Sequence, residues 1–152
     1  MANVVVIANR ALGDRALVEW MLRRDQVGVV EFRIVVPVRV PGPADFAGGM
    51  VGFVPLEGLH ASDYVAEARG RLSVVLDELR LCGVMASGSV HAGEAIHVLD
   101  DALDGWRVDE FAVAPAANAM SRLLGIDLAR RLRRRWAVPV CEIELRPRRA
   151  AA

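Results

Sequence analysis

Short apolar runs alternate with segments of helical periodicity along the chain, and this alternation constrains the fold more than any other feature. Runs rich in β-branched residues, such as Asn3–Ala8, predict strands that are buried on both faces. Between them, apolar residues that recur every three or four positions predict amphipathic helices. Five strands alternating with four helices predict a mainly parallel sheet with right-handed crossovers.

The element boundaries follow from local start and stop signals. Asp14 can cap a helix, Gly83 is typical of a helix end, and Pro37 and Pro115 are expected to close strands. We expect strands at Asn3–Ala8, Glu31–Val36, Val84–Val90, Asp109–Ala114 and Val138–Leu145. We expect helices at Asp14–Asp25, Ser62–Gly83, Ala92–Leu103 and Ser121–Arg135. The fold class is therefore α/β, a five-stranded, mainly parallel, doubly wound sheet with helices on both faces, a Rossmann-like three-layer α/β/α arrangement.

The length of 152 residues fits one domain, which we place at residues 1–146, with residues 147–152 as a disordered tail. Residues 37–60 are rich in Pro and Gly, and an irregular segment of this length is often functional. Whether it forms a lid is left open. No apolar run approaches the ~18 residues of a membrane span, and residues 1–8 lack the basic start of a signal peptide. We expect a cytoplasmic protein without a membrane partner.

The residue inventory excludes several kinds of chemistry. The sequence contains no Lys and no Thr, so a Walker phosphate loop and a Schiff-base enzyme are both excluded. Ser89 does not lie in a nucleophile elbow, because the flanking glycines are misplaced. His91 and His97 are six positions apart and cannot form a zinc pair on one helix face. We therefore predict no catalytic residues and no metal site.

A formal net charge of zero hides an asymmetry between the two parts of the chain. Residues 1–129 carry 11 Arg against 17 acidic residues, a net of −6, whereas residues 130–152 carry 8 Arg against 2 Glu, a net of +6. A basic segment can bind phosphates or an acidic partner. We favour a solvated helix face over nucleic-acid binding, and keep an acidic-partner or nucleic-acid module using Arg130–Arg149 as an alternative.

Three segments carry, in order, a familiar pattern. They are NVVVIANRALGDRALVEWM (Asn3–Met21), LRLCGVMASGSVHAGEAI (Leu79–Ile96) and DEFAVAPAANAMSRLLGIDLARRLRRRWAVPV (Asp109–Val140). The set resembles the universal stress protein family, within the adenine-nucleotide alpha hydrolase-like folds. The resemblance covers nearly the whole chain and looks closest to divergent actinobacterial members, which carry Pro in the phosphate loop.

The resemblance implies an adenine-nucleotide site that this chain has altered. ATP-binding members of the family use G-x2-G-x9-G-[ST] after the fourth strand, where this chain has Ala114-Pro115-Ala116-Ala117-Asn118. The family's acidic residue at the end of the first strand is Asn9 here, which we expect to bond a base or ribose edge. The alternative is that Asn9 and Asn118 are ordinary turn residues. We expect a non-enzymatic, regulatory or stress-related protein that binds ATP or another adenine nucleotide weakly, the alternative being an ATP-binding member with slow hydrolysis. The candidate ligand-binding residues are Asn9, Arg10, Val36, Val38, Pro115, Asn118, Ser121 and Arg122.

Two further expectations concern the end of the chain. If the family strand order holds, the last strand lies at the sheet edge, and an exposed apolar edge needs a partner. We expect a homodimer whose interface includes Val138, Val140, Ile143 and Leu145. A helix that starts at Ser121 offers unpaired backbone amides and the Arg122 guanidinium to an anion, although Ser121 could serve as a helix cap alone.

Overall fold

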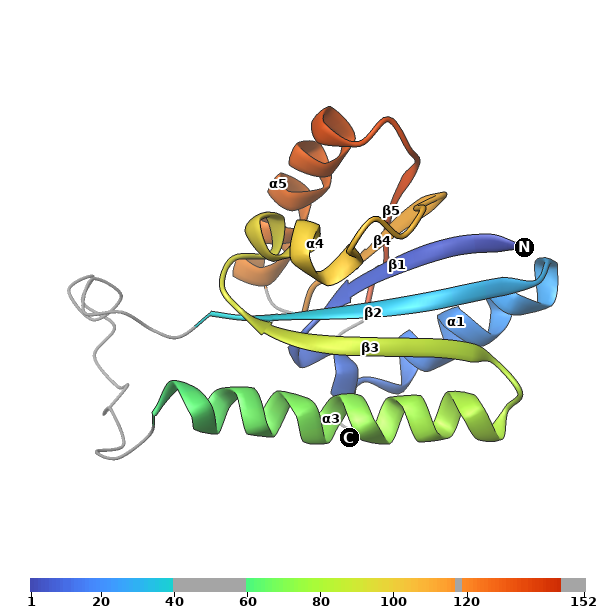
Figure 1. The fold of residues 1–152 in the computed structure, drawn as a ribbon, viewed down its shortest axis with the longest axis horizontal. Helices are drawn as coiled ribbons and strands as arrows, with labels where there is room; N and C mark the ends of the chain where they lie inside the picture. Colours follow the sequence, from blue (N-terminus) through green and yellow to red (C-terminus); the bar gives the residue numbers. More distant parts are fainter. Residues whose placement is uncertain (40–59, 117–118, 146–152) are drawn as a thin grey trace, which may run out of the picture.

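A computed structural model of the chain describes residues 1–39, 60–116 and 119–145. Its strands form one sheet in the order β3-β2-β1-β4-β5, and every neighbouring pair is parallel (Figure 1). The strands are β1 (Ala2–Ala8), β2 (Val30–Val38), β3 (Met85–Ala92), β4 (Glu110–Ala114) and β5 (Val140–Glu142). The helices are α1 (Arg15–Val27), α3 (Ala61–Leu81), α4 (Ala95–Leu103) and α5 (Ala119–Arg135), with a short 3-10 helix η1 (Arg10–Gly13) after β1.

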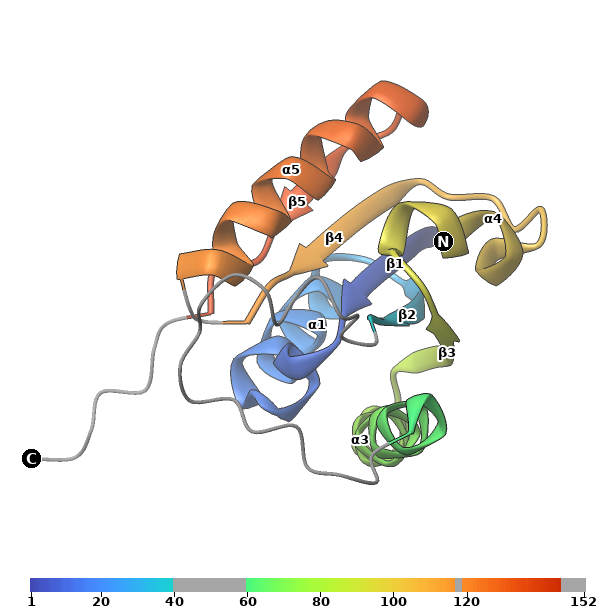
Figure 2. The ribbon, with the colours of Figure 1, turned by 90° about the vertical axis from the view of Figure 1, so that its left-hand side faces the viewer.

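Helices cover both faces of the sheet, so the predicted three-layer fold is confirmed. Helices α1 and α3 pack against one face, and α4 and α5 against the other (Figures 1 and 2). The strand order reverses beside β1, which pairs with β2 on one side and with β4 on the other. In doubly wound sheets the ligand crevice lies at the carboxyl ends of the strands at such a point.

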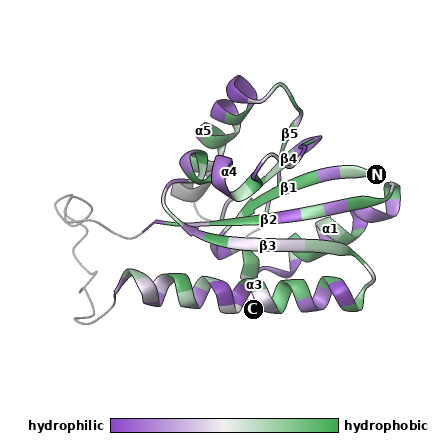
Figure 3. Cartoon of the chain, viewed as in Figure 1, coloured by the Kyte–Doolittle hydropathy of each residue, from purple (hydrophilic) through white to green (hydrophobic). Residues whose placement is uncertain are grey.

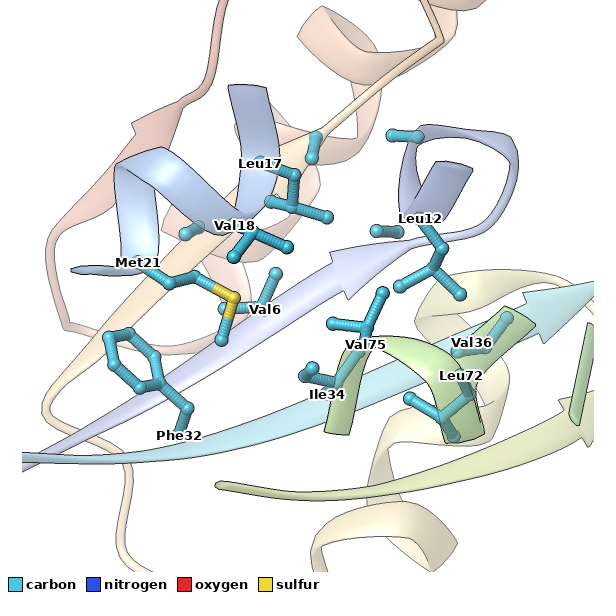
Figure 4. Close-up of a cluster of buried hydrophobic side chains, with 14 of the residues drawn as sticks. Val6, Leu12, Leu17, Val18, Met21, Phe32, Ile34, Val36, Leu72 and Val75 are labelled. Atoms are coloured by element: carbon cyan, nitrogen blue, oxygen red, sulfur yellow. The ribbon is translucent and has the colours of Figure 1, made fainter. Parts of the chain in front are cut away.

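The central strand β1 supplies both halves of the core. Val4 and Val6 point into the cluster under α1 and α3, whereas Val5 and Ile7 point into the cluster under α4 and α5. The strand is apolar and buried from Val4 to Ala8, because both faces are covered there, and Figure 3 shows β1 as mostly hydrophobic. Figure 4 shows the first cluster, in which Met21 of α1 lies above Phe32 of β2. Each such side chain contributes roughly 1.5–3 kcal/mol when fully buried.

Asp14 caps α1 as predicted, because its carboxylate accepts a hydrogen bond from the Ala16 N–H at 2.9 Å. The prediction that Pro37 ends the second strand is wrong. β2 continues to Val38, paired with β3 alone, because the β1–β2 ladder stops at Val35. The missing N–H of Pro37 therefore leaves no β1 partner unsatisfied.

β5 lies at the sheet edge as expected, but it is shorter than the predicted strand Val138–Leu145. The expectation that Ile143 and Leu145 are exposed there is wrong, since they are 4% and 6% exposed and belong to the core under α1 and α3. The Ile143 N–H still donates to the Val113 carbonyl at 2.8 Å, which holds this segment on the sheet. Val138 and Val140 are half-buried against the cluster on the opposite face.

Several predictions concern residues at or beyond the ends of the described ranges. α5 begins at Ala119, so Ser121 is the third residue of the helix and not its cap. Asn118, most of the 37–60 segment and the tail at 147–152 lie outside the described residues. Within the described part of the chain, no helix is both long enough and apolar enough to span a membrane.

Candidate functional site

A pocket of about 380 Å³ opens at the carboxyl ends of β1 and β2, beside the first half of α3. We call it the arginine pocket. It is lined by Asn9, Arg10, Val38, Arg39, Tyr64, Glu67 and Arg71. Three guanidinium groups face one carboxylate in this lining, so the pocket favours negatively charged ligands.

Asn9 holds the wall of the pocket together. Its side-chain nitrogen donates to the Pro37 carbonyl at 3.0 Å, and its side-chain oxygen accepts from Arg71 Nη2 at 2.9 Å. The first bond joins β1 to β2 just beyond their ladder, and the second joins β1 to α3. The side-chain amide is thus bonded to the protein at both ends, which does not favour the expected direct contact with a base or ribose.

Arg71 was missed by the sequence reasoning, although it is the central side chain of the pocket. Its Nη1 donates to Glu67 Oε1 at 2.5 Å, one helical turn earlier, while Nη2 reaches Asn9. Its Nε atom is buried and has no hydrogen-bond partner, alone in this respect among the side-chain atoms of the described residues. A buried donor without an acceptor costs about 1–3 kcal/mol. The i, i+4 spacing of Glu67 and Arg71 in the sequence indicates an ion pair on one helix face. It does not indicate the contact between Arg71 and Asn9.

The remaining candidates near the ends of β1 and β2 differ in whether they reach the pocket. Arg10 is exposed and lines the arginine pocket, and Val38 contributes an apolar wall. Val36 is fully buried among side chains of the α1 and α3 face, so it serves the core and presents no side chain to a ligand.

On the other side of β1, Pro115 follows β4 directly and its ring lies against α5. A Cβ placed on Gly125 of α5 would lie 3.0 Å from Pro115 Cγ and 3.1 Å from its Cβ. The absence of a side chain at Gly125 thus lets the proline ring approach the helix. Ser121 and Arg122 fall within the first turn of α5, and their part in anion binding stays a prediction.

The basic face of α5 pairs with acidic residues of α4. Arg131 donates to Glu94, and this hydrogen bond holds the pKa of the Glu94 carboxyl below its usual range. Arg135 pairs with Asp100, and Arg133 Nη2 donates to the Val140 carbonyl at 3.0 Å. These contacts join α5 to the α4 region and to β5 within the domain. They favour the interpretation of these arginines as a helix face over a nucleic-acid site.

Two other sets of polar side chains bear on catalysis and metal binding. Ser89 Oγ and His91 Nε2 lie 2.8 Å apart on β3, but no carboxylate in the described part of the chain orients the second ring nitrogen. A hydrolytic triad needs that third group. His97 Nδ1 lies 3.6 Å from Glu94, and the described residues include no group of three or more metal-ligating side chains.

The fold matches solved structures of universal stress proteins over almost the whole chain. A universal stress protein family member from Burkholderia pseudomallei superposes with a TM-score of 0.59 at 13% identity, covering 95% of this chain and 96% of that one. A universal stress protein in complex with cAMP gives 0.56 at 16% identity, covering 94% and 97%. A family protein from Arabidopsis thaliana with AMP bound gives 0.52 at 15% identity, covering 97% and 94%.

No protein-family model matches the sequence. No curated protein matches it either. The architecture is nevertheless clear, because the structural matches span the sheet and both helical layers. The chain has the fold of the universal stress proteins, as the sequence resemblance implied.

Proposed function

We propose that the chain is a divergent universal stress protein, a non-enzymatic regulatory protein that binds an adenine nucleotide weakly in an altered pocket. The strand order reverses at β1, and in doubly wound sheets ligands bind at the carboxyl ends of the strands at such a point, which supports a site beside β1, β2 and β4. Two proteins of this fold were crystallised with AMP and cAMP, which supports a nucleotide as the ligand class.

The contact of Pro115 with Gly125 carries the proposal of an altered pocket. Nucleotide-binding members of the family approach phosphate with glycine backbone at this turn, but here the chain has Pro115, whose ring packs against Gly125 in the second turn of α5. Proline also lacks the N–H that such a turn would donate. Each lost donor to a charged phosphate weakens binding by roughly 1.5–3 kcal/mol.

Titration calorimetry with ATP and AMP tests this proposal. We expect dissociation constants weaker than micromolar for both nucleotides and no release of phosphate from ATP. Micromolar or tighter ATP binding would show that the turn still holds a triphosphate, and steady ATP hydrolysis would favour the enzymatic alternative.

We also propose a homodimer in which β5 lies at the interface. The supporting observation is that β5 is an edge strand with Val138 and Val140 only half-buried within the subunit. Ile143 and Leu145 no longer belong to this proposed interface, because the core of the subunit buries them. Light scattering of the Val140→Lys variant should show a weaker dimer than the parent, and a parent that is monomeric at micromolar concentration would contradict the proposal.

A further inference from the structure

We infer that the arginine pocket binds a phosphate group, with Arg71 as its central contact. This site lies on the β1–β2–α3 side of the crevice, away from the β4–α5 turn where members of the family approach phosphate. The inference goes beyond the proposed nucleotide function, since it requires an oxyanion and no base or ribose.

The first argument is the fixed orientation of Arg71. Glu67 and Asn9 hold its two terminal nitrogens, so the guanidinium plane is set before any ligand arrives. A guanidinium fixed in this way loses little side-chain entropy on binding and presents a planar array of donors to an oxyanion.

The second argument is the donor that remains. Arg71 Nε is buried and unpartnered among the described residues, while the side chain as a whole keeps 28% of its surface exposed at the pocket. A phosphate in the pocket would meet the exposed part of the guanidinium, and it would reach the buried Nε–H only after a shift of the atoms that cover it. Buried polar groups normally have a partner, so an orphaned donor beside an open pocket points to a ligand.

The third argument is the charge around that donor. Arg10 lies at the carboxyl end of β1 and Arg39 just after β2, so two more guanidinium groups line the same pocket. Among the described residues of the lining, Glu67 is the one acidic side chain; it is paired with Arg71 and two-thirds exposed. Tyr64 also lines the pocket and carries no charge. The balance favours a dianion such as phosphate over a neutral ligand.

Thermal unfolding in inorganic phosphate tests the site, with sodium chloride of equal ionic strength as the reference. A site filled to ten times its dissociation constant should raise Tm by roughly 3–6 °C. We expect Arg71→Met to lose most of that rise. The matched control is Arg80→Met on the same helix, an exposed arginine outside the pocket, which should keep it. An equal rise in the Arg71→Met protein would overturn the inference.

A second variant keeps the test valid if Arg71→Met does not fold. Arg10→Met leaves the bonds among Asn9, Glu67 and Arg71 intact and removes one charge from the pocket. It should reduce the phosphate-induced rise in Tm, and an unchanged rise would contradict the site.

Adenosine and AMP separate this inference from the proposed function. Phosphate binding that depends on Arg71, without any gain from the adenosine moiety, would support the inference and overturn the nucleotide proposal. Equal binding of adenosine and AMP, unaffected by Arg71→Met, would overturn the inference and leave the nucleotide proposal in place.

Discussion

At the carboxyl end of the sheet, the residues on the two sides of β1 differ in charge and packing. On the β1–β2–α3 side, three arginines and one glutamate line a pocket of about 380 Å³. On the β4–α5 side, the ring of Pro115 packs against the bare backbone of Gly125, and the chain continues into the buried Ile143 and Leu145 after β5. The described residues thus line a charged pocket on the first side, and on the second they make an apolar contact between Pro115 and Gly125.

Because of this difference, residues at the ends of neighbouring strands should have different roles, some in stability and others in anion binding. Changes on the packed side should cost stability, because they create overlap or bury charge. Changes in the arginine pocket should alter the response to anions.

The largest effect is expected at Ile143. Replacing this buried residue with Lys places a charge in the core under α1 and α3, and we expect a loss of roughly 3–5 kcal/mol or failure to fold. Urea unfolding measures the loss, and Glu144→Lys at the exposed neighbouring position is the matched control. A change below about 1 kcal/mol for Ile143→Lys would show that this segment is not part of the core.

Smaller changes in stability are expected at two helical glycines, one on each side of β1. Gly70 of α3 has open space around its missing Cβ, so Gly70→Ala should stabilise by roughly 0.5–1 kcal/mol. Gly125→Ala must push against Pro115 and should lose about 1 kcal/mol of that benefit. The Pro115→Ala background should restore it in a double-mutant cycle. Additive effects of the two substitutions would contradict the contact.

Asn9→Ala tests the wall of the arginine pocket. The variant loses the bonds to the Pro37 carbonyl and to Arg71, and we expect a cost of about 1–2 kcal/mol in chemical denaturation. Asn9→Asp keeps an acceptor for Arg71 but loses the donor to Pro37, so it should fall between the parent and the alanine variant. Equal stability of all three proteins would mean that these bonds contribute nothing.

The smallest effect lies at the opposite end of the sheet, where Asp109 Oδ2 accepts the Asn3 backbone N–H at 2.9 Å. This hydrogen bond holds the pKa of Asp109 below its usual range. The stabilisation is therefore present above the ordinary carboxyl pKa and is lost as pH falls through the lowered value. Between pH 7 and pH 3, Tm of the parent should fall slightly more than Tm of Asp109→Asn, and parallel curves would contradict the prediction.

Local patterns were enough to predict the architecture. The apolar β-branched runs and the helical spacing gave all five strands, four helices and the parallel arrangement, because burial on both faces leaves a clear signal in the sequence. Strand ends were less predictable. Pro37 stays in β2 because β1 has already ended beside it, a fact that depends on register between strands and not on the proline itself.

The candidate site was only half predictable, for a similar reason. Asn9 and Arg10 follow a strand directly, so their place at the crevice could be inferred from the sequence. Arg71 lies more than 60 positions away on a long helix, and only the packing of α3 against the sheet brings it to Asn9. The burial of Ile143 likewise depends on how the segment after β5 turns toward the core, which its alternating pattern did not reveal.

Native mass spectrometry of the freshly purified protein tests the central claim most directly, because it detects a nucleotide retained from the cell. Because the ring of Pro115, just after β4, packs against Gly125 of α5, we expect the protein not to retain ATP through purification. We predict masses that correspond to the polypeptide, as a monomer or a dimer, without bound ATP. A stoichiometric ATP adduct in the native spectrum would contradict the account.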